Sequence, residues 1–212
     1  MDFTSLCNKL YKVDSNNLPG EESQFKMVPS IRPNLDWDAI ENSNPTKASV
    51  LLLVYPDADN ADDCKFVLIQ RNTYNGAHSA QISFPGGKHE GDETLEETAL
   101  RETFEEIGVD ASSVELVSPL TKVWVSPSKF LVTPFIGIST KKQTFIKDDF
   151  EVSEIIEVKL SEFLDDNCIS TSTVSSSYAK VLKVPSFNLS NKIVWGATAM
   201  ILSEFRDILL SE

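Results

Sequence analysis

Apolar positions along the chain follow two spacings, one typical of helices and one of buried strands. Spacings of three and four residues predict helices over residues 3–13 and 196–210. Short aliphatic runs predict strands over residues 48–55, 65–71, 81–84, 114–125, 130–139, 152–159, 180–184, 187–189 and 192–195. The first two of these strands flank a polar turn, so we expect them to form a hairpin.

Polar stretches separate these elements. Residues 14–45 are rich in Asn, Ser, Pro and Glu, which predicts an extended arm that either packs over the domain or mediates formation of a homodimer. Residues 169–177 are rich in Ser and Thr and are expected to form a loop, after a short helix near residues 161–165. Strands between substantial helices indicate an α/β fold, a mixed sheet in an α/β/α sandwich. We expect an N-terminal helix and arm over residues 1–46 and one main domain over residues 47–212.

The strongest helix signal covers residues 93–107 and ends at Gly108, a typical C-terminal cap. On a helical wheel, Leu100, Phe104 and Ile107 fall within an arc of about 60°. We therefore predict that these three side chains form the face of the helix that packs on the core.

Three glutamates, Glu102, Glu105 and Glu106, gather on the opposing side of this helix. They form either an acidic face in solvent or a site for a divalent cation. The carboxylates repel one another when alone, and a cation bound between them would make the cluster favourable. The surroundings favour the cation. Arg101 lies one turn from Glu105 and can hold its carboxylate, and Glu93 stands in the first turn, where the helix dipole favours negative charge.

Composition narrows the class of protein. With 19 basic and 32 acidic residues the net charge is -13, which disfavours nucleic acid and anionic membranes as partners because phosphate arrays are bound by excess Lys and Arg. The three cysteines are widely spaced and form no zinc motif, so we expect free thiols. Neither a secretory signal nor an apolar run long enough to span a bilayer is apparent, and we expect a cytoplasmic protein.

The segment from Gly87 to Val109 resembles the Nudix box. The positions that match the family's fixed spacing are Gly87, Glu93, Arg101, Glu102, Glu105, Glu106, Gly108 and Val109. Thr103 stands where the family usually has an aliphatic or small residue. The resemblance implies an α/β/α Nudix sandwich in which the box forms a loop–helix–loop. It also implies hydrolysis of a nucleoside diphosphate linked to another group, with Mg²⁺ or Mn²⁺ as cofactor.

The resemblance also implies a role for each box residue. Glu102, Glu105 and Glu106 look like metal ligands, Glu93 like a supporting ligand, and Arg101 like the residue that orients the cluster. The cations would neutralise the diphosphate and lower the pKa of a bound water, which attacks phosphorus once a carboxylate takes its proton. Glu102 is one candidate base.

Outside the box, Glu151 and Glu154 lie in an acidic stretch and are further candidates for the base, although this stretch can equally be a solvated edge. We rank Glu151 ahead of Glu154.

The sequence before the box is similar to that of the coenzyme A diphosphatase branch of the family. The positions that fit are Arg71, His78, Gln81, Phe84, Pro85, Gly86 and Gly87, whereas Asn72 and Ala80 depart from the pattern. Residues 126–137 and 193–205 resemble two further segments of that branch. The resemblance implies coenzyme A or acyl-CoA as substrate, with 3′,5′-ADP and 4′-phosphopantetheine or its acyl form as products.

Several of these residues suit such a substrate chemically. Arg71 and Lys88 flank the Gly-rich turn and can contact phosphate oxygens, and His78 can donate to a phosphate. Phe84 and Trp124 either line a pantetheine or adenine pocket or belong to the core. ADP-ribose, NADH or a nucleoside triphosphate is the alternative substrate. A non-catalytic nucleotide sensor is the alternative function, which the intact box carboxylates disfavour.

Overall fold

A mixed sheet forms the centre of the computed structural model, which describes residues 1–28, 35–72, 81–126, 128–176 and 179–211. Within these residues the sheet has eight strands, and β1 (Thr46–Pro56) pairs in parallel with β7 (Phe130–Ile138) at its middle. The other strands pair antiparallel: β2 (Cys64–Arg71), β3 (Ile82–Ser83), β4 (Gly86–Lys88), β5 (Glu115–Pro119), β6 (Val123–Val125) and β8 (Val152–Lys159). The predicted hairpin of β1 and β2 is confirmed.

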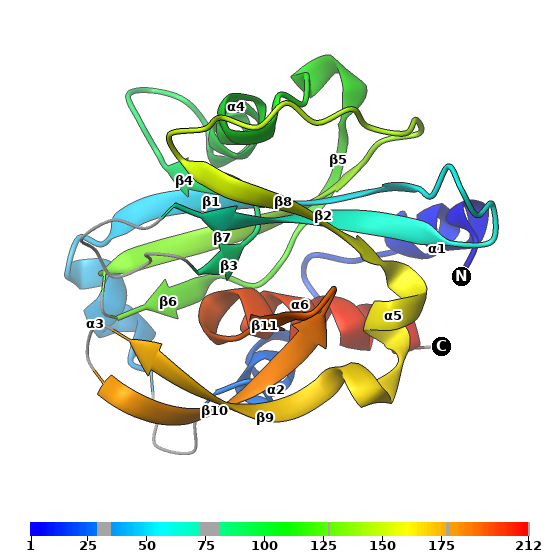
Figure 1. The fold of residues 1–212 in the computed structure, drawn as a ribbon. Helices are drawn as coiled ribbons and strands as arrows, with labels where there is room; N and C mark the ends of the chain where they lie inside the picture. The colour runs from blue at the N-terminus through cyan, green and yellow to red at the C-terminus, as the bar shows by residue number, and fades with distance from the viewer. Residues whose placement is uncertain (29–34, 73–80, 127, 177–178, 212) are drawn as a thin grey trace.

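Helices cover both faces of this sheet, which confirms the predicted α/β/α sandwich. Helix α4 (Leu95–Ile107) lies on one face and α6 (Gly196–Leu210) on the other (Figure 1). A second sheet of β9 (Ile169–Ser176), β10 (Ala179–Leu189) and β11 (Lys192–Val194) lies beyond α6 in the same view. A short helix, α5 (Leu160–Leu164), joins the two sheets, and 3₁₀ turns lie at Ala111–Ser113 and Asp166–Cys168.

Strand β1 is apolar on both sides because each side faces its own core. Leu52 and Val54 belong to the cluster that includes Phe205 of α6, whereas Leu51 and Leu53 belong to the cluster that includes Ala99 of α4. Successive side chains of a strand point to opposite faces, so an unbroken apolar run fits a strand that is buried on both faces.

The N-terminal segment packs on the domain, as one of the two interpretations of its sequence predicted. Helix α1 (Phe3–Leu10) contributes Leu6 and Leu10 to the core on the α6 side. The prediction that residues 14–45 are extended was partly wrong, because this segment contains helices α2 (Gly20–Phe25) and α3 (Trp37–Asn42). Tertiary contacts fix α2, in which Gln24 donates to the buried carboxylate of Glu204 at 3.0 Å.

Residues 169–176 form strand β9, which contradicts the predicted loop. The hydroxyls of Ser170 and Ser172 bond to that of Ser186 on β10 at 3.2 and 2.8 Å, so the polar side chains are part of the sheet. The two strands predicted over residues 180–189 are one strand, β10, and the strand predicted over residues 114–125 is divided into β5 and β6. Strand β4 was missed because the sequence Pro85-Gly86-Gly87 was interpreted as the end of a strand.

All three cysteines lie in the described part of the chain and are free thiols, as predicted, with Cys64 and Cys168 buried. Among the described residues, no helix has the length and apolar character needed to cross a membrane.

Candidate active site

Helix α4 is defined at both ends by its own sequence. The Thr94 hydroxyl accepts from the Glu97 amide at 3.2 Å, and the Glu97 carboxylate accepts from the Thr94 amide at 2.7 Å, forming a capping box. At the other end Gly108 adopts a left-handed conformation, φ 73°, and closes the helix. The segment is thus a loop–helix–loop, and the helix begins two residues after the predicted start at Glu93.

The predicted core face of α4 was partly wrong. Ile107 is buried as predicted and Leu100 is half-buried, but Phe104 is 57% exposed, and Ala99 and Thr103 are buried instead. The hydroxyl of Thr103 donates to the Ala99 carbonyl at 2.6 Å, so this polar residue is satisfied within the helix. The helical wheel was oriented by the largest apolar side chains. In the structure, the face of α4 that packs on the sheet contains both apolar and polar residues and includes Glu106.

Arg101 links three of the predicted metal ligands. Its Nε and Nη2 atoms donate to the two oxygens of Glu93, both at 2.9 Å, and Nη1 donates to Glu102 at 2.9 Å and to Glu105 at 2.8 Å. Nη2 also donates to the Lys88 carbonyl at 3.1 Å. The guanidinium holds the pKa of Glu93 at about 2, with help from the amide of Glu90. Arg101 is therefore in contact with three of the four box glutamates named above.

Glu106 is the most buried carboxylate of the box, with 1% of its surface exposed. It accepts from Arg71 Nη1 at 2.9 Å and from the Gly86 amide at 2.8 Å. Burial raises its pKa to about 7 even though the Arg71 charge lowers it. A second carboxylate stands nearby, since Glu151 lies 3.8 Å from Arg71 Nη2.

Glu102 lies against the backbone of Gly87. A Cβ atom at Gly87 would come within 2.4 Å of the Glu102 carboxyl group, so the absence of a side chain leaves room for this carboxylate. Burial raises the pKa of Glu102, while its bond from Arg101 lowers it. The two glycines of β4 therefore bring backbone directly against two glutamates of the box.

The chemistry of these donors fits a divalent cation. Within the described residues, no group of three or more carboxylate, imidazole or thiol side chains is arranged to hold a metal ion, and Arg101 is bonded to Glu102 and Glu105. The donors are nonetheless carboxylate oxygens, which Mg²⁺ and Mn²⁺ prefer. The residues that could hold a cation are therefore Glu102, Glu105 and Glu106, with Glu93 beside them.

A cavity of about 380 Å³ lies next to these carboxylates. The predicted substrate-binding residues that line it are Arg71, Gln81, Phe84, Gly86, Gly87 and Lys88. The remaining one, His78, lies outside the described residues. The glycines of β4 form the boundary between the cavity and the glutamates, since Gly86 bonds to Glu106 and Gly87 lies against Glu102.

Residues far along the chain complete the walls of the cavity and were not predicted individually. They are Val125, Ser128, Phe130 and Val132 from β6, β7 and their connection, and Trp195, Gly196, Ala197, Thr198 and Ile201 around the start of α6. Thr198 donates to the Ile82 carbonyl at 2.9 Å and so fixes the start of α6 to β3. All of them except Val125 lie in the two segments that resemble the coenzyme A branch, residues 126–137 and 193–205, but no side chain of these segments was assigned to the site.

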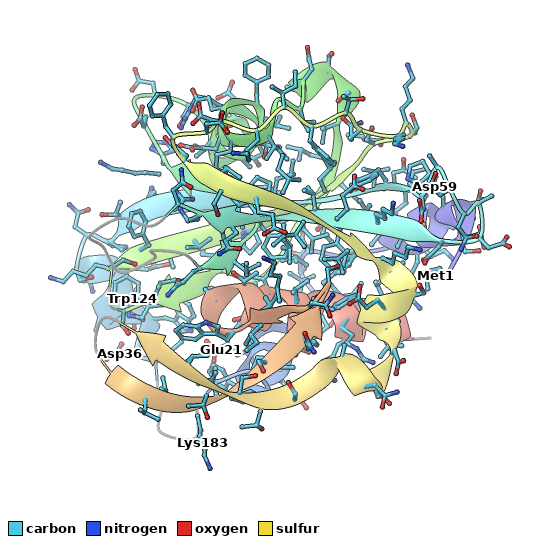
Figure 2. The ribbon with its side chains drawn as sticks, viewed as in Figure 1. Met1, Glu21, Asp36, Asp59, Trp124 and Lys183 are labelled. Atoms are coloured by element: carbon cyan, nitrogen blue, oxygen red, sulfur yellow. The ribbon has the colours of Figure 1, made fainter. Side chains whose placement is uncertain are left out.

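Trp124 is not among the cavity residues, although Phe84 is. Trp124, labelled in Figure 2, lies on β6 between Val123 and Val125, and Val125 lines the cavity. Because neighbouring side chains of a strand point to opposite faces, Trp124 is directed away from the cavity. Phe84 is 1% exposed and belongs to the core as well as to the cavity wall.

The chain is similar in sequence to proteins of one known family. The NUDIX domain family model matches residues 45–172. Nudix hydrolase 3 of Caenorhabditis elegans is 32% identical over 147 residues, which cover 68% of this chain and 60% of that protein. Nudix hydrolase 15, mitochondrial, of Arabidopsis thaliana is 33% identical over 186 residues, 85% of this chain and 64% of that protein. The chain thus spans less than two thirds of the length of these relatives.

Among solved structures, the Nudix hydrolase RenU of M. smegmatis superposes with a TM-score of 0.53 at 15% sequence identity. The match covers 78% of this chain and 86% of that one. At this identity the similarity supports the fold alone.

Proposed function

The chain belongs to the Nudix hydrolase family, and from this membership we propose that it is a Mg²⁺- or Mn²⁺-dependent hydrolase of coenzyme A or acyl-CoA. The products would be 3′,5′-ADP and 4′-phosphopantetheine or its acyl form. The family sets the type of reaction, hydrolysis of a diphosphate, and the cavity supports the choice of substrate.

One observation carries the proposal. Three segments that resemble the coenzyme A branch, residues 68–87, 126–137 and 193–205, are far apart in the chain and share one cavity. The cavity residues Gly86, Gly87 and Lys88 belong to β4, which is also in contact with the box glutamates. A substrate that occupies this cavity can therefore place its diphosphate beside the carboxylates.

Each group of site residues has its own role in the proposed reaction. Glu102, Glu105 and Glu106 would hold the cation, with Glu93 in support, and the bound cation would neutralise the diphosphate and acidify the attacking water. Arg101 is anchored by two hydrogen bonds to Glu93, and it holds the carboxylates of Glu102 and Glu105 in place. Arg71 and Lys88 add positive charge at the edge of the cavity, where phosphate oxygens would lie.

The base that takes the proton of the water is proposed to be Glu151. Its carboxylate lies 3.8 Å from Arg71 and so stands on the same side as Glu106. Glu154, the alternative, is bonded to Lys192 at 2.5 Å. Glu102 remains a candidate within the box because its pKa is raised.

The proposal is tested by incubating the purified protein separately with coenzyme A, ADP-ribose and NADH. Each substrate is tested with and without Mg²⁺ or Mn²⁺, and the products are identified by mass. We expect metal-dependent release of 3′,5′-ADP from coenzyme A. Metal-dependent cleavage of ADP-ribose or NADH with coenzyme A among the poorest substrates would overturn the choice of substrate.

Two variants test the proposed cation site. Glu102→Gln is expected to lower turnover on the order of 1,000-fold, since a lost ligand removes several kcal/mol of transition-state stabilisation. Glu96→Gln changes an exposed glutamate of the same helix and should keep the parental rate. Equal rates for both variants would contradict the assignment, and no metal-dependent turnover by the parent would favour a non-catalytic nucleotide sensor.

A further inference from the structure

The cavity beside the box has a charged edge and an uncharged interior. Its described lining residues include two cations, Arg71 and Lys88, and both belong to the edge that adjoins the box glutamates. The rest of the described lining is uncharged and mostly apolar, with aromatic side chains from Phe84, Phe130 and Trp195. Any charged group of a substrate beyond this edge would lose its hydration without gaining a partner among these residues.

Uncharged hydrogen-bonding groups lie among these apolar walls. Gln81, Ser128 and Thr198 all line the cavity. The Thr198 hydroxyl uses its proton on the Ile82 carbonyl, and its oxygen still has capacity to accept. Such groups suit amides, which carry donors and acceptors without charge.

The size of the cavity also limits its occupant. Its volume of about 380 Å³ lies near the lower end of the range of roughly 300–1,000 Å³ that is usual for ligand sites. A coenzyme A molecule has two large halves on either side of its diphosphate, and a cavity of this size accommodates one of them. The other half must lie outside.

From this distribution of charge we infer that the cavity binds the amide-bearing, uncharged pantetheine half of the substrate and leaves the nucleotide half outside. The 3′-phosphate of the nucleotide half is anionic and would need a cation in the interior, which the described lining does not supply. The inference rests on the proposed function for the identity of the substrate. It adds the orientation in which the substrate binds.

The test uses Val132→Phe, which adds an aromatic ring to a half-buried position of the cavity wall. Binding of 4′-phosphopantetheine and of 3′,5′-ADP is measured separately by calorimetry, for the parent and the variant. We expect the variant to weaken 4′-phosphopantetheine on the order of tenfold or more and to leave 3′,5′-ADP unchanged. Ala197→Leu fills the cavity from α6 and serves as a second variant if Val132→Phe does not fold.

The outcomes separate this inference from the proposed function. Weakened 3′,5′-ADP with unchanged 4′-phosphopantetheine would place the nucleotide in the cavity and overturn the inference, even if coenzyme A is cleaved. Unchanged affinity for both ligands in a folded variant would also overturn it. If the parent binds 4′-phosphopantetheine and Val132→Phe weakens it, but only other diphosphates are cleaved, the proposed function fails, whereas the assignment of the cavity to an uncharged, amide-bearing group stands.

Discussion

The guanidinium of Arg71 lies 2.9 Å from the carboxylate of Glu106 and joins the end of β2 to the last turn of α4. The two residues come from different motifs, one before the box and one within it. In the absence of a cation, Arg71 is the charge that balances this buried glutamate. A cation bound to Glu106 would take over that role and release Arg71 toward the diphosphate.

The buried carboxylates predict a dependence of stability on pH in the metal-free protein. Burial raises the pKa of Glu106 from 4.5 to about 7 and also raises that of Glu102. Between pH 4.5 and about pH 7 the folded protein therefore binds more protons than the unfolded chain. The free energy of unfolding falls as the pH rises across this range. For Glu106 the expected loss is about 3 kcal/mol, since one pKa unit corresponds to about 1.4 kcal/mol.

Urea denaturation in EDTA from pH 5 to pH 8 measures this loss. Glu93 contributes little to this change, because its folded pKa of about 2 and its unfolded value of 4.5 both lie below the range. Glu106→Gln should flatten the profile over the same range. A parental profile that is already flat, or a steep one that the variant preserves, would show that Glu106 is not the titrating group.

The orientation of α4 predicts unequal costs for two apolar truncations. Ile107 is fully buried, so Ile107→Ala should lower the free energy of unfolding by about 2–5 kcal/mol. Phe104 is 57% exposed, and Phe104→Ala should cost less than about 1 kcal/mol, as is usual for surface positions. Thermal or urea denaturation of both variants gives the comparison. A larger loss for Phe104→Ala would mean that the helix is turned as the wheel suggested.

The sequence predicted most of the layers of the fold but only part of the face of α4 that packs on the sheet, because that face depends on residues far away along the chain. Strands such as β1 carry their signal in unbroken apolar runs, and Gly108 marks the end of the helix. The burial of Glu106 instead depends on Arg71 and Gly86, which lie 35 and 20 residues away along the chain. A helical wheel uses only the helix itself and therefore assigns a glutamate to solvent.

The contacts among the box residues were easier to predict than the cavity beside them. Box positions such as Arg101 act through neighbours within a few residues, so their spacing contains the signal. The cavity is built from β3, β6, β7 and the start of α6, which only the folded sheet brings together. For that reason Trp195 and Ile201 were not assigned to the cavity from the pattern. For Trp124 the sequence left a pocket wall and the core open, and it is Val125, the next residue, that lines the cavity.

The two glycines of β4 predict different failures when each is replaced by alanine. A Cβ at Gly86 would lie 2.3 Å from the Ser49 carbonyl oxygen and 2.6 Å from the Val50 Cα, and φ is +147°. Since backbone cannot move aside easily, Gly86→Ala should prevent folding or lower the melting temperature strongly. The three atoms nearest to a Cβ at Gly87 all belong to the carboxyl group at the end of the Glu102 side chain. A side chain can move aside where backbone cannot, so Gly87→Ala should fold and lose turnover by about 100-fold through displacement of that group.

Gly91→Ala is the control for backbone strain alone. Its φ is +53° with no atom within 4 Å of the added Cβ, so we expect a loss of roughly 1 kcal/mol in stability and the parental rate. Melting curves and turnover of the three variants are compared. Full activity of Gly87→Ala would contradict the close contact with Glu102.

Glu151 and Glu154 offer a matched pair for identifying the base. Glu151 has 57% of its side chain exposed and faces Arg71, whereas Glu154 is paired with Lys192. If Glu151 takes the proton of the attacking water, Glu151→Gln should lower kcat by about 100-fold or more with little change in KM. Its stability should stay within about 0.5 kcal/mol of the parent.

Glu154→Gln is the matched control and should keep the parental kcat. The reverse result would assign the base to Glu154. If both variants keep the parental kcat, Glu102 is the remaining candidate for the base.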